Sequence, residues 1–103
     1  MTQAELPEAA LADVGSILDY YLAEAGVEVA GRFLDVFEFA IRQIRQEPGI
    51  GSPRLALALR SPALRIWPIK GFPHLILYLD LPDGVQIWRV LHSARDIPAH
   101  LQE

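Results

Sequence analysis

Two stretches of helical periodicity, separated at Gly26, constrain the fold of this chain more than any other feature. Pro7 suits the first turn of the first helix, which we place at residues 7–25, and Gly26 ends it. Its apolar side chains recur every three or four residues, at Leu11, Val14, Leu18, Tyr21, Leu22 and Ala25. The second helix starts near Val27 or Glu28 and ends at Pro48-Gly49, and its stripe is Ala30, Phe33, Leu34, Phe37, Ile41 and Ile44. So short a joint predicts an antiparallel helical hairpin.

The second half of the chain favours β-strands. Residues 64–70 form a strand interrupted or edged by Pro68, residues 74–80 are apolar on both faces like a central strand, and residues 85–91 close the sheet. Leu81-Pro82-Asp83-Gly84 predicts a hairpin turn. Residues 2–6 alternate weakly and suggest a short edge strand, whereas the state of residues 55–60 stays open because alanine and leucine prefer helix. The prediction is an α+β fold, a helical hairpin packed on a small antiparallel sheet, in one domain over residues 1–103.

Composition excludes several classes of site. The chain has no cysteine, so it forms no disulfide and no thiolate metal site. Its three histidines, His74, His92 and His100, show no close metal-binding spacing, and no phosphate-binding glycine motif is present. No apolar run approaches the roughly 20 residues that cross a bilayer, and the N-terminus lacks a basic signal region. We therefore expect a cytoplasmic protein that uses no cofactor and no metal.

Charge is unevenly distributed between the two halves. Residues 1–50 carry nine acidic and three basic side chains, whereas residues 51–103 carry six basic and four acidic ones, so the halves have net charges of −6 and +2. The carboxylates of the first half are expected on a solvated helical face. An anion-facing surface belongs to the second half. That surface is too modest for a nucleic-acid-binding stripe, so we expect no direct DNA binding by this chain alone.

The candidate functional residues lie in the second half. Five cations could converge as donors to phosphate, carboxylate or carbonyl groups, namely Arg60, Arg65, Lys70, Arg89 and Arg95. Tyr78 and His92 are the nearby groups able to move a proton. Structural roles compete with these functions: His92 would fix the corner after the last strand, Tyr78 would border the core, and Arg95 with Asp96 would anchor the tail. Trp67 and Trp88 are expected in the core on the sheet rather than as base-stacking platforms.

Helix 2 has an apolar surface wider than one stripe. Val29, Val36, Phe39 and Ala40 lie outside the main periodic positions, and 51% of the chain is hydrophobic. These residues either broaden the core or form a docking face for a partner. Gly31, within the same helix, costs about 1 kcal/mol against alanine. This cost is tolerable if Gly31 lets helix 1 approach closely.

The order strand, helix, helix and three strands resembles the RelE/ParE family of toxins from bacterial type II toxin–antitoxin modules, nearest the ParE branch. The likeness is carried by Pro7-Glu8-Ala9, Asp13, Ile17, Tyr20-Tyr21, Ala30, Arg32-Phe33, Pro48-Gly49-Ile50-Gly51, Leu64-Arg65, Lys70-Gly71-Phe72-Pro73, Leu75-Ile76-Leu77-Tyr78, Arg89-Val90-Leu91-His92 and Ala94-Arg95-Asp96-Ile97. The resemblance implies a growth-arresting toxin co-expressed with a small antitoxin that wraps over it. The ParE branch is linked to poisoning DNA gyrase, and the RelE branch to cutting mRNA in the ribosome.

We favour a non-enzymatic ParE-type inhibitor of DNA gyrase, neutralised by a ParD-like antitoxin with a ribbon–helix–helix N-terminus. A ribosome-dependent endoribonuclease is the alternative, with Tyr78, Arg89, His92 and Arg95 as candidate catalytic residues. A third possibility is a decayed toxin that only binds its antitoxin. Residues expected to bind the target or the antitoxin are Arg60, Arg65, Lys70, Arg89, His92, Arg95, Val29, Val36 and Phe39.

Overall fold

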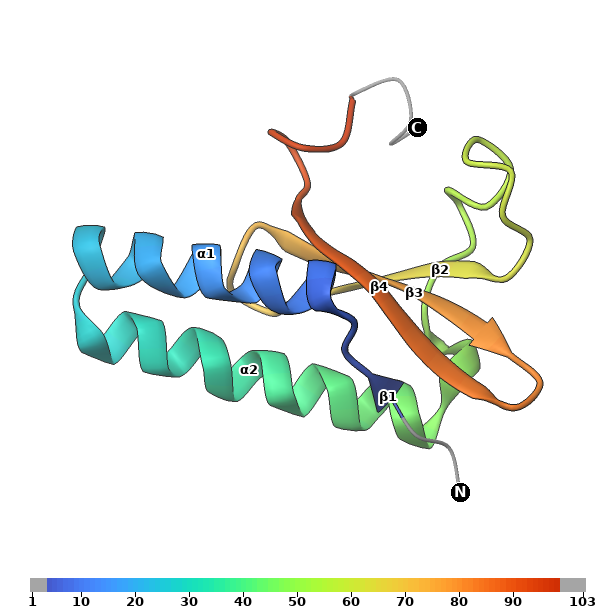
Figure 1. The fold of residues 1–103 in the computed structure, drawn as a ribbon, viewed down its shortest axis with the longest axis horizontal. Helices are drawn as coiled ribbons and strands as arrows, with labels where there is room; N and C mark the ends of the chain where they lie inside the picture. The colour runs from blue at the N-terminus through green and yellow to red at the C-terminus, as the bar shows by residue number, and fades with distance from the viewer. Residues whose placement is uncertain (1–3, 99–103) are drawn as a thin grey trace.

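A pair of antiparallel helices packs on one face of a four-stranded sheet (Figure 1). This computed structural model describes residues 4–98. Its elements are β1 (Ala4–Glu5), α1 (Glu8–Glu24), α2 (Val27–Gln46), the 3-10 turn η1 (Pro48–Ile50), β2 (Leu64–Pro68), β3 (His74–Leu81) and β4 (Gly84–His92). The strand order is β1-β4-β3-β2. The predicted helical hairpin on an antiparallel sheet is confirmed.

Glycine makes the joint between the helices. Gly26 has a φ of +94°, and its N–H and that of Ala25 both donate to the carbonyl of Tyr21, which ends α1. The buried stripe of α1 differs from the predicted one. It consists of Ala10, Val14 and Ile17, whereas Leu11 and Leu22 are half exposed, at 56% and 50%.

α2 buries Ala30, Phe33, Phe37, Ala40 and Ile44 against the sheet, while Leu34 and Ile41 are only half-buried. The role expected of Gly31 is wrong. A side chain built at this position would meet no atom within 4 Å, so no element approaches it closely. Gly31 carries the helical cost of glycine with no packing contact at this position in return.

The three long strands are antiparallel neighbours. Asp80 pairs with Val85 and Leu81 with Gly84, so Pro82 and Asp83 form the predicted two-residue turn, and Gly84 has a φ of +145°. Further along, Tyr78 pairs with Ile87 but Leu77 pairs with Arg89, which leaves Trp88 as the extra residue of a bulge. Trp88 is 45% exposed, so its predicted place in the core is wrong.

The bulge lets β4 keep contact with the helices along its length. Val85, Ile87 and Val90 all enter the core under α1 and α2, although Ile87 and Val90 are three residues apart. Without an extra residue, an odd separation would place one of them on the opposite face. Trp67 is half-buried and packs against the same core.

The sheet ends differ slightly from the predictions. β1 pairs in parallel with β4 through Ala4 with Val85 and Glu5 with Gln86, and residues 2 and 3 of the expected strand lie outside the described part of the chain. β2 ends at Pro68 rather than Lys70, because proline has no N–H to continue a ladder.

A second, smaller core lies on the face of the sheet that turns away from the helices. It contains Leu55, Leu64, Ile66, Leu75, Leu77 and Ile97. Residues 55–60, whose state the sequence leaves open, belong to a run of consecutive turns over residues 54–60. These turns place Leu55 in this core but leave Leu57 90% exposed. In Figure 1 this loop projects beyond β2. Among residues 4–98 no helix is long and apolar enough to cross a membrane.

Candidate functional site

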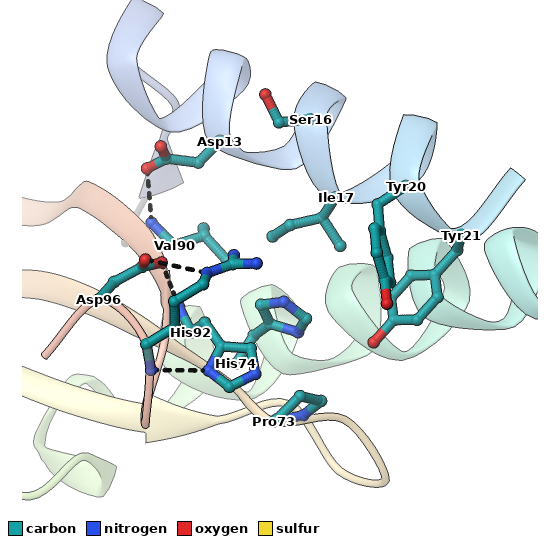
Figure 2. Close-up of a pocket in the computed structure, with 11 residues that line it drawn as sticks. Asp13, Ser16, Ile17, Tyr20, Tyr21, Pro73, His74, Val90, His92 and Asp96 are labelled. Carbon is teal, nitrogen blue, oxygen red and sulfur yellow. Dashed lines mark hydrogen bonds and ion pairs between the residues drawn. The ribbon is translucent and has the colours of Figure 1, made fainter. Parts of the chain in front are cut away.

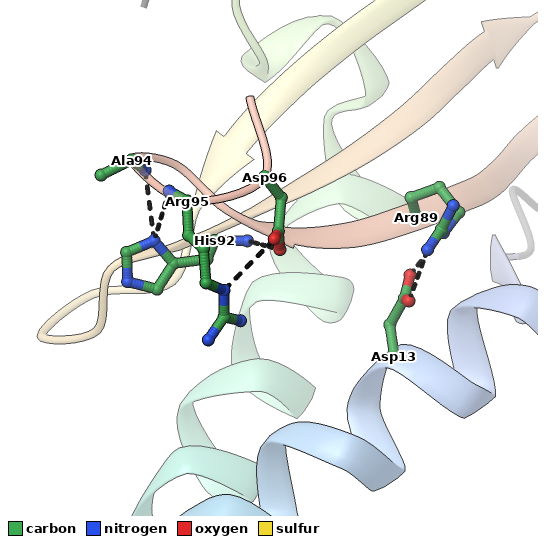
Figure 3. Close-up of polar contacts among 6 residues, drawn as sticks. All are labelled: Asp13, Arg89, His92, Ala94, Arg95 and Asp96. Carbon is green, nitrogen blue, oxygen red and sulfur yellow. Dashed lines mark hydrogen bonds and ion pairs between the residues drawn. The ribbon is translucent and has the colours of Figure 1, made fainter. Parts of the chain in front are cut away.

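Arg89 connects β4 to α1. Its Nε and Nη2 each donate to one oxygen of the Asp13 carboxylate, both at 2.7 Å (Figure 3). The N–H of Val90 donates to Oδ2 of the same carboxylate at 3.0 Å. The hydrogen bonds that Arg89 donates to Asp13 raise the pKa of Arg89. Asp13 is only 14% exposed and joins residues 76 apart in the chain. It therefore does not belong to the solvated face predicted for the first-half carboxylates.

His92 and Asp96 fix the corner that follows β4. Nδ1 of His92 accepts the backbone N–H groups of Ala94 and Arg95, at 3.2 and 3.0 Å. The Asp96 carboxylate accepts the N–H of His92 at 2.8 Å and Nε of Arg95 at 3.2 Å (Figure 3). The backbone N–H of His92, followed by the Arg95 side chain, lowers the pKa of Asp96. These are the hydrogen bonds expected of residues that hold a corner in one shape.

Arg95 has the most accessible cation of this corner. Its side chain is 66% exposed, and its Nε donates to the carboxylate of the adjacent Asp96. The sequence predicts that His92, Arg95 and Asp96 come together, and they do. Arg89, three residues before His92, is engaged by a different carboxylate.

A pocket of about 480 Å³ separates α1 from this corner (Figure 2). Its lining residues are Asp13, Ser16, Ile17, Tyr20, Tyr21, Pro73, His74, Val90, His92, Arg95 and Asp96. His74 is 5% exposed, and burial together with the charges of His92 and Arg95 lowers its pKa to about 4. Its Nδ1 is buried and has no hydrogen-bond partner among the described residues.

Tyr78 is enclosed in the fold. Its ring is fully buried, its hydroxyl donates to the carbonyl of Pro48 at 2.6 Å, and the same oxygen accepts the N–H of Gly51 at 2.9 Å. Burial raises the pKa of this hydroxyl. A side chain at Gly51 would lie 2.6 Å from the hydroxyl oxygen and 2.8 Å from the carbonyl oxygen of Ile66. Tyr78 thus anchors η1, and the close approach requires glycine.

The cations of the second half do not form one cluster. Arg65 pairs with Asp80 at 3.2 Å and donates to the carbonyl of Gly51 at 2.8 Å. Arg60 and Lys70 are exposed, in the loop before β2 and in the turn after it. Arg65, Arg89 and Arg95 are therefore each engaged by a different carboxylate.

A groove of about 550 Å³ lies between α2 and the end of β2. It is lined by Asp35, Val36, Phe39, Ala40, Gln43, Trp67, Pro68 and Lys70. Phe39 is 52% exposed, and the guanidinium of Arg42 lies 5.7 Å from the centre of its ring. Val36, Phe39 and the buried Ala40 of the wide apolar surface line this groove, whereas Val29 lies outside it.

Sequence reasoning did not single out Asp13, His74 or Gly51 as parts of these sites. Asp13 carried one usable signal, an acidic residue on an apolar stretch of helix, but its partner is 76 residues away. His74 precedes a run of apolar residues, which indicates burial without indicating a pocket. No three side chains able to ligate a metal come together within residues 4–98, and His100 lies outside that range.

Comparison with known proteins identifies the family. Residues 4–97 match the sequence model described as "ParE toxin of type II toxin-antitoxin system, parDE". No curated protein matches this chain. The fold is similar to that of a chain from a solved structure entitled "Chromosomal ParDE TA system from P. aeruginosa", with a TM-score of 0.75 and 21% identity over 89% of this chain and 96% of the other. The match over residues 4–97 shows that the chain belongs to the family of ParE toxins of type II toxin–antitoxin systems.

Proposed function

We propose that this ParE toxin arrests growth by binding and inhibiting DNA gyrase, without cleaving any substrate, and that a ParD-like antitoxin neutralises it. The observation that carries the choice of an inhibitor over a nuclease is the environment of Tyr78. RNA cleavage needs one group to activate the 2′-hydroxyl and another to protonate the leaving oxygen. The Tyr78 hydroxyl is buried, donates to Pro48 and accepts from Gly51, so it has no access to a substrate.

The other candidate catalytic residues support the same choice. The Nδ1 atom of His92 is engaged by two backbone N–H groups, and Arg89 is held by Asp13. Proteins that dock among RNA phosphates gain affinity by neutralising them, and a chain with a net charge of −4 is poorly suited to that environment. Inhibiting a topoisomerase requires only a complementary surface.

The groove between α2 and β2 supports a partnership with an antitoxin. Phe39, Val36 and Trp67 offer an apolar surface, and the exposed Lys70 lies at the same groove. An amphipathic helix could lay its apolar side chains on Phe39 and place an acidic residue near Lys70. The ribbon–helix–helix domain expected at the antitoxin's N-terminus would lie outside this contact.

The target is tested by adding the purified chain to gyrase and measuring supercoiling of relaxed plasmid. We expect a dose-dependent loss of supercoiling and no mRNA cuts on translating ribosomes. Cleavage of mRNA with supercoiling intact would replace the inhibitor with a RelE-type endoribonuclease. If neither activity is found but the antitoxin still binds, the chain is a decayed toxin.

The partnership is tested by replacing Phe39 in the groove. Phe39→Asp places a charge on the apolar surface, and we expect it to weaken binding of the antitoxin encoded next to this chain at least tenfold, because a buried charge without a partner is costly. Leu22→Asp is the matched control, since Leu22 is similarly exposed but lies outside the groove. Equal binding by both variants would remove the groove from the antitoxin interface.

A further inference from the structure

The pocket between α1 and the corner after β4 is lined by both polar and apolar side chains (Figure 2). Ile17, Tyr20, Tyr21 and Pro73 supply rings and aliphatic surface, and they can enclose a short methylene chain. His74, His92 and Arg95 supply nitrogen atoms. Its volume of about 480 Å³ is large enough to accommodate a side chain from a partner.

The hydrogen bonds of His92 determine which nitrogen carries its proton. Nδ1 accepts the N–H groups of Ala94 and Arg95, so it holds a lone pair rather than a hydrogen. The proton of the neutral ring is therefore on Nε2, which acts as a donor. In this way the corner presents Nε2 of His92 as a donor.

Arg95 contributes further donors. Its Nε bonds to Asp96, and among residues 4–98 no partner is present for its two Nη groups. The pocket's two carboxylates are already committed: Asp13 to Arg89 and Val90, and Asp96 to His92 and Arg95. The unsatisfied capacity of the pocket is thus in its donors, which suits an anion rather than a cation.

His74 provides an independent sign that something completes this pocket. Its ring is packed edge-on against Tyr21, Phe33 and His92, and the side chain is 95% buried. Its Nδ1 has no partner within the described chain. A buried polar atom left without a hydrogen bond costs about 1–3 kcal/mol, and most such atoms in native proteins are satisfied.

We propose that this pocket binds the carboxylate of a glutamate side chain presented by the antitoxin. The carboxylate would accept from Arg95, from Nε2 of His92 and from a proton on Nδ1 of His74, while the two methylene groups pack between Tyr20, Tyr21 and Ile17. A phosphate fits less well, because only one guanidinium faces the pocket and Asp13 and Asp96 line it. The chemistry of the pocket stands by itself, and the antitoxin as the source of the glutamate rests on the proposed function.

The pocket is tested first with small probes, followed through the imidazole signals of His74 and His92 in the full chain by NMR. N-acetylglutamate amide is the probe, N-acetylglutamine amide its uncharged control, and inorganic phosphate the competing anion. We expect saturable shifts of both histidines with the glutamate probe at millimolar concentration and none with the glutamine probe. Arg95→Gln should weaken binding at least tenfold, since it removes a charged hydrogen bond, whereas Arg60→Gln, in the exposed loop, should not.

Three outcomes would overturn this proposal. The absence of shifts with the glutamate probe would show that no carboxylate binds. Tighter binding of phosphate than of the glutamate probe would assign the pocket to a phosphate group. Equal binding of the glutamate and glutamine probes would show that contact with the methylene chain, not the charge, drives association.

The source of the carboxylate is tested with the antitoxin itself. We expect Arg95→Gln to weaken antitoxin binding at least tenfold and Phe39→Asp to weaken it independently. If the antitoxin depends on Phe39 but not on Arg95, the proposed function stands and the pocket's occupant is wrong. If no antitoxin binds at all while the glutamate probe does, the proposed partnership fails and the carboxylate site remains, with another protein as its source.

Discussion

The two arginine–carboxylate pairs at the end of β4 have the same chemistry and opposite surroundings. Arg89 is held by Asp13 through two bonds of 2.7 Å, and this carboxylate is 14% exposed between a helix and a strand. Arg95 contacts its chain neighbour Asp96 through one bond of 3.2 Å, with its own side chain 66% exposed. The first pair joins distant elements, and the second leaves donors for a partner. Burial and separation along the chain, rather than the kind of ion pair, distinguish stabilising residues from binding ones.

The largest effect is expected from breaking the first pair. Asp13→Ala leaves the Arg89 guanidinium and the Val90 N–H without their acceptor, and we expect it to cost about 3 kcal/mol of the free energy of unfolding. Urea unfolding measures this cost. Asp19→Ala is the control, because Asp19 is an exposed carboxylate on the same helix. Equal stability of the two variants would mean that the contact between Arg89 and Asp13 contributes nothing to the free energy of unfolding.

A second prediction tests whether His74, which lies beneath the exposed corner, is buried in the folded protein. Burial lowers the pKa of His74 to about 4, below its value of about 6.5 in an unfolded chain. Between these values the unfolded chain binds more protons, so this contribution to stability is complete above pH 6.5 and is lost as the pH falls towards 4. We expect a loss of about 2 kcal/mol.

The measurement is the free energy of unfolding at several pH values for the native chain and for His74→Gln. The variant cannot take up a proton in this range, so its stability should fall about 2 kcal/mol less between pH 7 and pH 4. Parallel pH curves for the two proteins would contradict a buried, neutral His74.

A third prediction tests whether an uncharged contact between distant elements also stabilises the fold. Tyr78 connects β3 to η1 without any charge, through Pro48 and Gly51. Tyr78→Phe keeps the ring and removes both hydrogen bonds, and we expect it to cost about 1–2 kcal/mol. Thermal unfolding gives the value. An unchanged Tm would show that the uncharged contact adds no stability, and it would restrict the comparison to charged pairs.

The smallest effect is expected at the exposed pair. Arg95→Ala removes a surface ion pair between adjacent residues, so the free energy of unfolding should change by less than about 0.5 kcal/mol. Arg89→Ala, at a position within β4, should reduce the free energy of unfolding several times more. If Arg95→Ala unfolded as readily as Arg89→Ala, the corner would be a structural anchor and its role in binding would lose support.

Local patterns predicted the elements, and contacts between distant residues determined what the sequence could not indicate. Gly26 and Pro48 mark the helix ends because each has a local backbone reason to do so. The buried face of α1 was missed because Leu11 and Leu22 are more hydrophobic than Ala10, while the sheet, not the helix, determines which side is covered. The bulge at Trp88 likewise depends on pairing with β3 and has no signature within β4.

The candidate site was predictable only in part. The charged cluster of His92, Arg95 and Asp96 lies within five residues, so its proximity follows from the chain itself. The partner of Arg89 and the closed position of Tyr78 depend on residues 76 and 30 positions away. A lone sequence shows such groups as unpaired cations and hydroxyls, which made them look more available than they are.

The hydrogen bond that the Val90 N–H donates to Asp13 also protects an exposed strand edge against aggregation. Within residues 4–98, β1 pairs with β4 at Val85 and Gln86 alone, and no other described strand covers the rest of that side of β4. An uncovered strand edge is a template on which a second chain can add and aggregate. The Asp13 carboxylate occupies the Val90 N–H and brings a charged pair to this edge. One helical side chain thereby protects the edge of β4 beyond the residues that pair with β1.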